Sequence, residues 1–212
     1  MGGRKSQRDK DNKVIRSDAA AFMPQPKHKK EKRLEQIKPI PPFKKNKKHN
    51  QAEYDRQLKM QEDGINKMSV VDWMNNKDNF DNLKNNPTAK KQHKDAAKRA
   101  RDKHRKKEIN NLAKSYQKKD KNLSRDAAVK KAENALKGKH ALHEVDAVAG
   151  GNNTTIAGMG DGAINSSIGS QWDKSRADSI KAQVTQQLKD MGIKVPPNSN
   201  IPPDLKMNVQ LL

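Results

Sequence analysis

Cysteine is absent from this chain of 212 residues. Disulfide bonds, thiolate metal sites and cysteine nucleophiles are therefore excluded. Aromatic residues make up only 3% of the chain and hydrophobic residues 31%, so a core can form only where the apolar residues are concentrated. No apolar run reaches the roughly 18 residues of a membrane span, and no secretory segment follows Met1. We therefore expect neither a membrane protein nor an ordinary export signal.

Positive charge is abundant and unevenly distributed. The chain has 46 basic and 25 acidic residues, a net charge of +21. Residues 140–212 contain six basic and seven acidic side chains, so residues 1–139 carry a net charge of +22. A cationic surface of this size attracts polyanions, and the expected partner is nucleic acid or an acidic protein. A charge excess that only keeps the chain in solution is the alternative.

The composition divides the chain near residue 51. Residues 1–50 mix lysine clusters with prolines and have neither helical nor strand periodicity. This pattern predicts a basic arm that is disordered or held extended by a partner. Apolar residues become dense only beyond the arm, so residues 51–212 are predicted to form a single domain.

Helical patterns dominate this predicted domain. Gly64 is a candidate C-terminal cap, and Ser69 followed by Asp72 resembles a capping box. Helices are predicted over residues 51–64, from Ser69 onward, over residues 87–118, over residues 124–138 and over residues 170–192. The predicted fold class is mainly α.

Residues 150–170, GGNNTTIAGMGDGAINSSIGS, interrupt the helical pattern. They contain six glycines and no helical repeat. We predict a long glycine-rich irregular insert of loops or short strands, and long loops in compact domains are usually functional. Glycine amides can approach a phosphate closely.

The stretch HALHEVDAVAGGN precedes this insert and contains His143 and Asp146. On a helical turn, side chains three residues apart share a face, so an imidazole and a carboxylate could enter one pocket. The histidine could then activate water as a general base, and the carboxylate could orient it or hold a divalent cation. His140 could complete a metal set. The pair alone is a weak signal, because a surface or capping role produces the same spacing.

Three blocks of the sequence together carry a family resemblance. YDRQLKMQEDGINKMSVVDWM, HALHEVDAVAGGN and GMGDGAINSSIGSQW resemble, in this order, the polymorphic toxin type 15 family of antibacterial effector domains, whose hallmark is an HxxD motif. The resemblance implies a nuclease with a mainly α-helical fold, DNA as substrate and a divalent cation, Mg²⁺, as cofactor. It also implies delivery into the cytoplasm of a target bacterium by a secretion apparatus, often of type VI, and a cognate immunity protein.

The HxxD motif of this family falls on His143 and Asp146, which the resemblance implies to be catalytic. The first block adds Gln61 and Glu62. Glu62 joins Asp146 as a candidate metal ligand, although a solvated helix face explains Glu62 as well. The other candidates for contacts to the site or to phosphate are His140, Asp161, Asn165, Ser166, Ser167 and Gln171, whereas Trp172 is expected to pack in the core.

The basic helix over residues 87–118 is predicted to hold the nucleic-acid backbone without reading its sequence. The candidate side chains are Lys90, Lys91, Lys94, Lys98, Arg99, Arg101, Lys103 and Arg105. Two other functions remain open: a ribonuclease toxin that cleaves through the 2′-hydroxyl without metal, and a non-enzymatic basic nucleic-acid-binding protein. The charge predicts that the immunity protein is acidic. No small-molecule cofactor is expected, because no dinucleotide or phosphate-loop glycine pattern fits.

Overall fold

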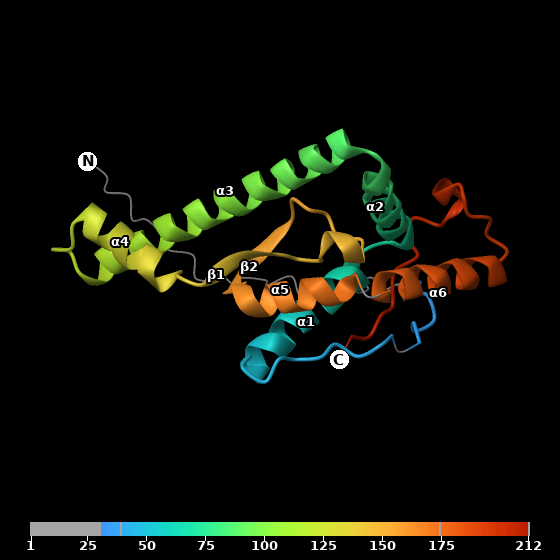
Figure 1. Ribbon diagram of the computed structural model, residues 1–212, viewed down its shortest axis with the longest axis horizontal. Helices are drawn as coiled ribbons and strands as arrows, with labels where there is room; N and C mark the ends of the chain where they lie inside the picture. Colours follow the sequence, from blue (N-terminus) through green and yellow to red (C-terminus); the bar gives the residue numbers. More distant parts are fainter. Residues whose placement is uncertain (1–30, 39, 174, 212) are drawn as a thin grey trace, which may run out of the picture. The chain divides into compact units, whose positions relative to one another are not determined.

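The computed structural model describes residues 31–38, 40–173 and 175–211. This part contains six α-helices and one small antiparallel sheet (Figure 1). The helices are α1 (Gln51–Lys67), α2 (Val70–Asn82), α3 (Pro87–Lys119), α4 (Arg125–Ala135), α5 (Gly162–Trp172) and α6 (Arg176–Asp190). The strands are β1 (Lys139–His143) and β2 (Ile156–Asp161), and short 3₁₀ turns are η1 (Leu83–Asn85), η2 (Ala147–Ala149) and η3 (Asn198–Asn200). The predicted mainly α fold class is confirmed.

Local sequence signals start several of these helices. The hydroxyl oxygens of Ser69 and Ser124 accept hydrogen bonds from backbone N–H groups three residues on, at the starts of α2 and α4. Asn86 caps α3 in the same way, immediately before Pro87. A side-chain acceptor at the cap satisfies an otherwise unpaired N–H group, and proline is preorganised for the first helical position. These starts agree with those predicted from the sequence.

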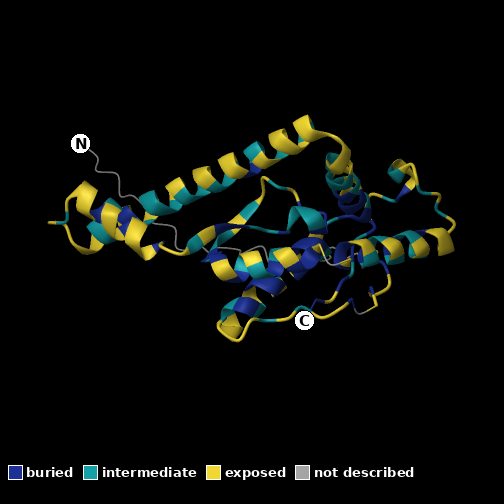
Figure 2. Cartoon of the chain, in the orientation of Figure 1, coloured by how far each residue is buried: buried dark blue, intermediate teal, exposed yellow. Residues whose placement is uncertain are grey.

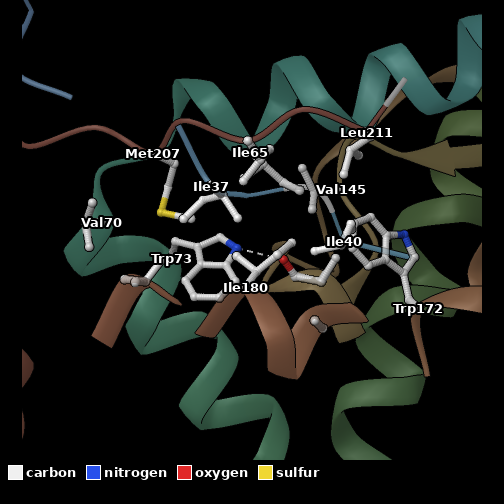
Figure 3. Close-up of a cluster of buried hydrophobic side chains, with 14 of the residues drawn as sticks. Ile37, Ile40, Ile65, Val70, Trp73, Val145, Trp172, Ile180, Met207 and Leu211 are labelled. Atoms are coloured by element: carbon white, nitrogen blue, oxygen red, sulfur yellow. Dashed lines mark hydrogen bonds between the residues drawn. The ribbon is translucent and has the colours of Figure 1, made fainter. Parts of the chain in front are cut away.

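The main core lies among α1, α2, α6 and the C-terminal segment. Ile65, Trp73, Ile180 and Met207 are fully buried there, and Figure 3 shows them in one cluster. The Trp73 indole nitrogen donates a hydrogen bond to the carbonyl oxygen of Ala149 over 2.8 Å. This bond satisfies the polar end of a buried indole and ties α2 to η2.

Helices α3 and α4 form a hairpin with a small core of its own. Ala113, Ala128 and Ala132 are fully buried between the two helices. Much of the remaining surface of α3 is exposed (Figure 2). Nearer the main core, α3 and α5 both contact the β1–β2 hairpin (Figure 1). Within the described ranges, no helix is long and apolar enough to cross a membrane.

The described part of the predicted arm, from Glu31 onward, packs against the rest of the domain. Leu34 has only 2% of its surface exposed, and its backbone N–H donates to the carbonyl oxygen of Lys206 over 3.0 Å. The sequence concealed this packing because the apolar side chains are scattered among lysines and prolines, and their partners lie at the other end of the chain. The rest of the predicted arm, residues 1–30, lies outside the described residues.

The insert over residues 150–170 was expected to form loops or short strands. β2 agrees with this expectation, whereas α5 corrects it, because the chain from Gly162 onward is helical. Oδ1 of Asp161 accepts hydrogen bonds from two successive backbone N–H groups of α5, each over 3.0 Å. This cap and the complete burial of Ile168 stabilise a helix whose glycines and serines have low intrinsic propensity. Trp172 therefore ends α5 rather than opening the next helix, but it is buried as expected.

Candidate functional site

His143 stands at an irregularity in the sheet. The register between β1 and β2 shifts between Leu142 and His143, and His143 pairs with Ile156. Such bulges redirect a side chain at the end of a strand. The chain then turns, and Asp146 caps η2 by accepting a hydrogen bond from the Val148 N–H over 3.0 Å. The helical turn considered for the HxxD motif is replaced by a strand end and a 3₁₀ cap, which place the two residues.

The two motif residues nevertheless line the same pocket. Its volume is about 520 Å³, and α3 forms the opposite wall. The lining residues are His93, Lys94, Asp95, Ala97, Lys98 and Arg101 from α3, His143, Asp146 and Ala147 from the motif, and Asn153. We call this the HxxD pocket. Among the residues that the structure describes, no hydrogen bond or ion pair joins the His143 and Asp146 side chains directly.

One contact fixes the protonation of the histidine. Nη1 of Arg101 lies 3.1 Å from Nε2 of His143. A guanidinium group has only donors, so Nε2 must be the acceptor and carry no proton. The proton of the neutral ring then resides on Nδ1, which is buried without a well-formed hydrogen bond. His143 thus presents its basic nitrogen towards the Arg101 side of the pocket.

The surroundings lower the pKa of His143 below its usual 6.5. Burial is the largest cause, and the positive charge of Arg101 and the nearby His93 act in the same direction. The Thr155 backbone opposes them. The neutral form therefore persists at neutral pH, as a general base requires.

Asp146 is held by the protein on several sides. Its backbone N–H donates to Oε1 of Gln61 over 3.3 Å, and a Cβ built on Gly169 would lie 3.2 Å from Oδ2. Burial raises the pKa of Asp146, partly offset by the Val148 N–H, and the charge of Asp173 raises it further. This carboxyl group positions the turn after His143 as well as lining the pocket.

Glycines allow the motif to pack tightly. A Cβ on Gly64 would lie 2.6 Å from a methyl carbon of Val145, and one on Gly151 would lie 2.1 Å from the Val145 carbonyl oxygen. Gly64 lies inside α1, which continues to Lys67, so the expected C-terminal cap at Gly64 is wrong. These glycines are explained by close approach of the backbone.

His93 was not identified from the sequence, yet it lines the HxxD pocket. Its ring meets Phe80 edge-on at 5.9 Å, and its carbonyl oxygen accepts a hydrogen bond from the Asn153 side chain over 2.7 Å. Burial lowers the pKa of this imidazole. A usable signal was present, because His93 shares a helical face with Ala97 and Arg101.

The side chains of Gln61 and Glu62 contact different parts of the structure. Oε1 of Gln61 accepts from the Trp172 indole over 2.8 Å and from the Asp146 backbone, so Gln61 supports the motif. The Glu62 carboxylate instead pairs with Lys59 at 2.6 Å and accepts from the Leu211 N–H over 2.7 Å. Glu62 therefore does not line the HxxD pocket.

His140 lies apart from His143, in a neighbouring pocket with Arg101 and Arg105. Its ring packs over Gly162 at the start of α5. The two histidines therefore do not form the metal set considered from the sequence.

The other candidates on α5 have contacts within the fold. The Asp161 side chain caps the helix, and the Ser166 hydroxyl donates to the Gly162 carbonyl oxygen over 2.9 Å. The Gln171 side chain exchanges two hydrogen bonds with the backbone of Lys44. Asn165 is partly buried, and Ser167 lines a different pocket beside Lys44. None of these candidates lines the HxxD pocket.

Three of the predicted phosphate-contacting residues line the pocket, namely Lys94, Lys98 and Arg101. Arg105 instead donates to the backbone carbonyl oxygens of Lys139 and Leu136, at 2.8 and 3.3 Å, and so docks α3 onto β1. The remaining predicted side chains, Lys90, Lys91, Arg99 and Lys103, are exposed along α3.

The predicted metal ligands do not converge. Within the described residues, no three histidine, aspartate or glutamate side chains gather around a common point. Asp146 is the single predicted ligand that lines the HxxD pocket, and one of its oxygens already caps η2. The protein side chains by themselves therefore do not fit a resident divalent cation, and we derive no step through one.

Fold and motif together define a basic, mainly helical domain that carries an HxxD sequence at a cationic pocket. A family model described as Novel toxin 15 matches residues 48–198, more than half of the chain, and the chain belongs to that family. It is therefore a polymorphic toxin domain, in agreement with the resemblance of its three sequence blocks. A search of curated proteins gave no match.

Proposed function

We propose that this toxin domain is a nuclease that hydrolyses phosphodiester bonds of DNA in the HxxD pocket. The observation that carries the proposal is the 3.1 Å contact between Nη1 of Arg101 and Nε2 of His143, in a pocket also lined by Lys94 and Lys98. A base beside several cations suits the attack of water on a phosphodiester, because the reaction needs both proton transfer and compensation of phosphate charge.

In this proposal His143 removes a proton from water while the water oxygen forms a bond to phosphorus. The bond from phosphorus to the leaving ester oxygen breaks, and that oxygen takes a proton from solvent. Lys94, Lys98 and Arg101 stabilise the charge on the phosphoryl oxygens. Asp146 acts as a positioning residue through its cap on η2. The phosphate contacts carry no base information, so cleavage has little sequence preference.

Cleavage of supercoiled plasmid by the purified full chain tests the proposal, with parallel reactions in Mg²⁺ and in EDTA. We expect His143→Ala to lose cleavage and Asp146→Ala to reduce it. His140→Ala is the matched control, because this imidazole lies outside the HxxD pocket, and it should cleave like the parent. Cleavage by His143→Ala at the parent rate would overturn the mechanism. The expectation from the sequence is that cleavage needs Mg²⁺. Loss of cleavage in EDTA would show that a divalent cation is needed and enters with the substrate.

RNA is the second candidate substrate, supported by the presence of two partly buried imidazoles, His93 and His143, in one pocket. Two such groups can transfer protons to and from a 2′-hydroxyl without metal. Cleavage of RNA in EDTA, with none of DNA of the same sequence, would select this reaction. Salt-sensitive binding of both without cleavage would instead indicate a non-enzymatic binding protein.

The toxin family and the charge support a biological setting for the proposed nuclease. The domain is delivered by a secretion apparatus or its adaptor into the cytoplasm of a target bacterium, and a cognate immunity protein protects the producer. With a net charge of +22 on residues 1–139, that partner should present an acidic surface. Co-expression with the product of the adjacent reading frame should restore growth, and a basic interface on that product would contradict the proposed complementarity.

A further inference from the structure

We infer that Arg101 covers the catalytic base in the free protein and releases it when a substrate phosphodiester takes over the guanidinium. The inference rests on the proposed function of the HxxD pocket and adds a regulatory step to it. It makes Arg101 a residue that first occupies the lone pair of His143 and then contacts substrate.

The first step of the argument is the occupied lone pair. The 3.1 Å contact between Nη1 of Arg101 and Nε2 of His143 uses the nitrogen that has to accept a proton from water. While the contact persists, that nitrogen cannot act as a base. The donor must therefore leave before the histidine can react.

The second step is the availability of Arg101 to an anion. In the part of the chain that the structure describes, the Arg101 guanidinium forms no ion pair. Its neighbour Asp102 is instead paired with Lys98 at 2.8 Å. The guanidinium thus binds a neutral imidazole, which is a weaker acceptor than a phosphate oxygen because bonds between a cation and an anion are charge-assisted. A phosphodiester also offers two oxygens to the planar fork.

The third step is the space around the side chain. Arg101 lines the HxxD pocket and also the neighbouring pocket, of about 420 Å³, that contains Lys139 and His140. The guanidinium can therefore turn away from His143 without leaving a solvent-accessible, polar environment. Lys94 and Lys98 on the same wall draw the phosphate into the pocket, whereas Asp95 and Asp146 are the acidic groups that line it.

The test follows the ring nitrogens of His143 by NMR in the ¹⁵N-labelled full chain, with inorganic phosphate as the probe and sodium chloride as the ionic-strength control. His143→Gln assigns the signal. We expect the free protein to show an Nε2 that carries no proton and accepts a hydrogen bond. Phosphate should remove the signature of that bond and raise the pKa of His143, because it draws away the positive charge that lowers this pKa.

Two variants of Arg101 distinguish the loss of its contact with His143 from a general loss of folded structure. In Arg101→Ala the pKa of His143 should already be raised without phosphate, and kcat should fall on the order of 10²-fold because a donor to the phosphoryl group is lost. Arg101→Lys retains the charge without the fork, and we expect it to bind DNA with nearly the parent KM but with a reduced kcat. Circular dichroism verifies the helical content of both variants.

Arg125→Ala is the matched control, because it removes an exposed arginine on α4 whose side chain contacts Asn110. It should leave the pKa of His143 and kcat unchanged. The inferred cover is rejected if Arg101→Ala and the parent give the same His143 signals. It is also rejected if phosphate changes neither the hydrogen-bond signature at Nε2 nor the pKa of His143. Because NMR needs no turnover, this result is independent of whether the chain cleaves DNA. Conversely, cleavage that needs His143 but not Arg101 would preserve a nuclease with His143 as its base and would reject the inferred contact of Arg101 with substrate.

Discussion

The indole nitrogen of Trp172 and the side-chain oxygen of Gln61 form a buried hydrogen bond of 2.8 Å. The same oxygen accepts a second hydrogen bond from the backbone of Asp146. One amide on α1 therefore joins the end of α5 to the motif that carries the proposed base. Beside it, Trp172 meets Phe43 edge-on at 4.8 Å, so the segment before α1 also reaches this support.

Replacing Gln61 by leucine should leave both donors without an acceptor inside the protein. We expect the free energy of unfolding to fall by about 1–3 kcal/mol, the usual cost of unsatisfied buried polar groups. Cleavage should also fall, because the turn after His143 loses a fixed contact. Urea unfolding and plasmid cleavage measure the two effects. Gln92→Leu, at an exposed position of α3, is the control, and equal stability of the two variants would contradict the supporting role of Gln61.

Gly64→Ala tests the close packing of α1 against the motif. Alanine favours a helix over glycine, by about 1 kcal/mol, so propensity alone predicts stabilisation. The new methyl group would instead lie 2.6 Å from the Val145 side chain, and we expect lower stability and weaker cleavage. Gly158→Ala is the matched change, because no atom lies within 4 Å of its added carbon. Parent-like cleavage by Gly64→Ala would show that the motif can shift without loss of function.

Leu34→Ala tests whether the segment before α1 belongs to the folded unit. Truncating a fully buried leucine costs about 2–5 kcal/mol through lost burial and the cavity left behind. Lys47→Ala changes an exposed side chain of the same segment and should have almost no effect. Thermal and urea unfolding of the full chain compare the two. A stability of Leu34→Ala equal to that of Lys47→Ala would mean that residues 31–50 are dispensable for the fold.

Acid should weaken the fold through the two histidines of the HxxD pocket. Burial is the largest cause of the lowered pKa of both His143 and His93. The unfolded chain, with ordinary histidines near 6.5, therefore binds protons first as the pH falls. Their contribution to the free energy of unfolding is complete above about pH 6.5 and is lost as the pH falls towards the lowered values.

Asp146 affects the pH dependence of stability in the opposite direction, because its pKa is raised. Its contribution to the free energy of unfolding is complete below the ordinary pKa of 3.8 and is lost as the pH rises through the raised pKa. Urea unfolding of the parent and of His143→Gln between pH 7.5 and 5 tests the histidine effect, because Asp146 is present in both proteins. The parent should become less stable towards pH 5, and His143→Gln should show a shallower dependence on pH. An identical dependence in the two proteins would show that His143 has an ordinary pKa.

Local signals in the sequence were sufficient for part of the fold. Ser69 and Ser124 start helices through contacts within three residues, so their caps could be predicted. The segment around Leu34 could not be, because its hydrogen-bond partners follow α6. Helix α5 was missed because its glycines and serines indicate loops, whereas its stability comes from a cap at Asp161 and from burial.

In the candidate site, too, features that depend on neighbouring residues could be predicted, whereas contacts between distant segments could not. The HxxD pair could be selected from the family resemblance, whereas its spacing alone is a weak signal. The contact of Arg101 with His143 depends on where a long helix crosses the end of a strand, and nothing in the local sequence specifies that crossing. The sequence selected the basic helix that lines the HxxD pocket, but it could not separate Lys94, Lys98 and Arg101 from the basic neighbours that do not line it.

One wall of the HxxD pocket is formed by α3, and the other by β1 and the turn that follows it. Along the chain, the two walls are connected through the α3–α4 hairpin. Arg105 holds the walls together through two carbonyl oxygens close to this junction. A helix of 33 residues is about 50 Å long, so a small tilt of its far end becomes a displacement at the pocket. Because His93 and Arg101 lie on α3 and His143 lies at the end of β1, the width of the pocket depends on the angle at which α3 crosses that strand end.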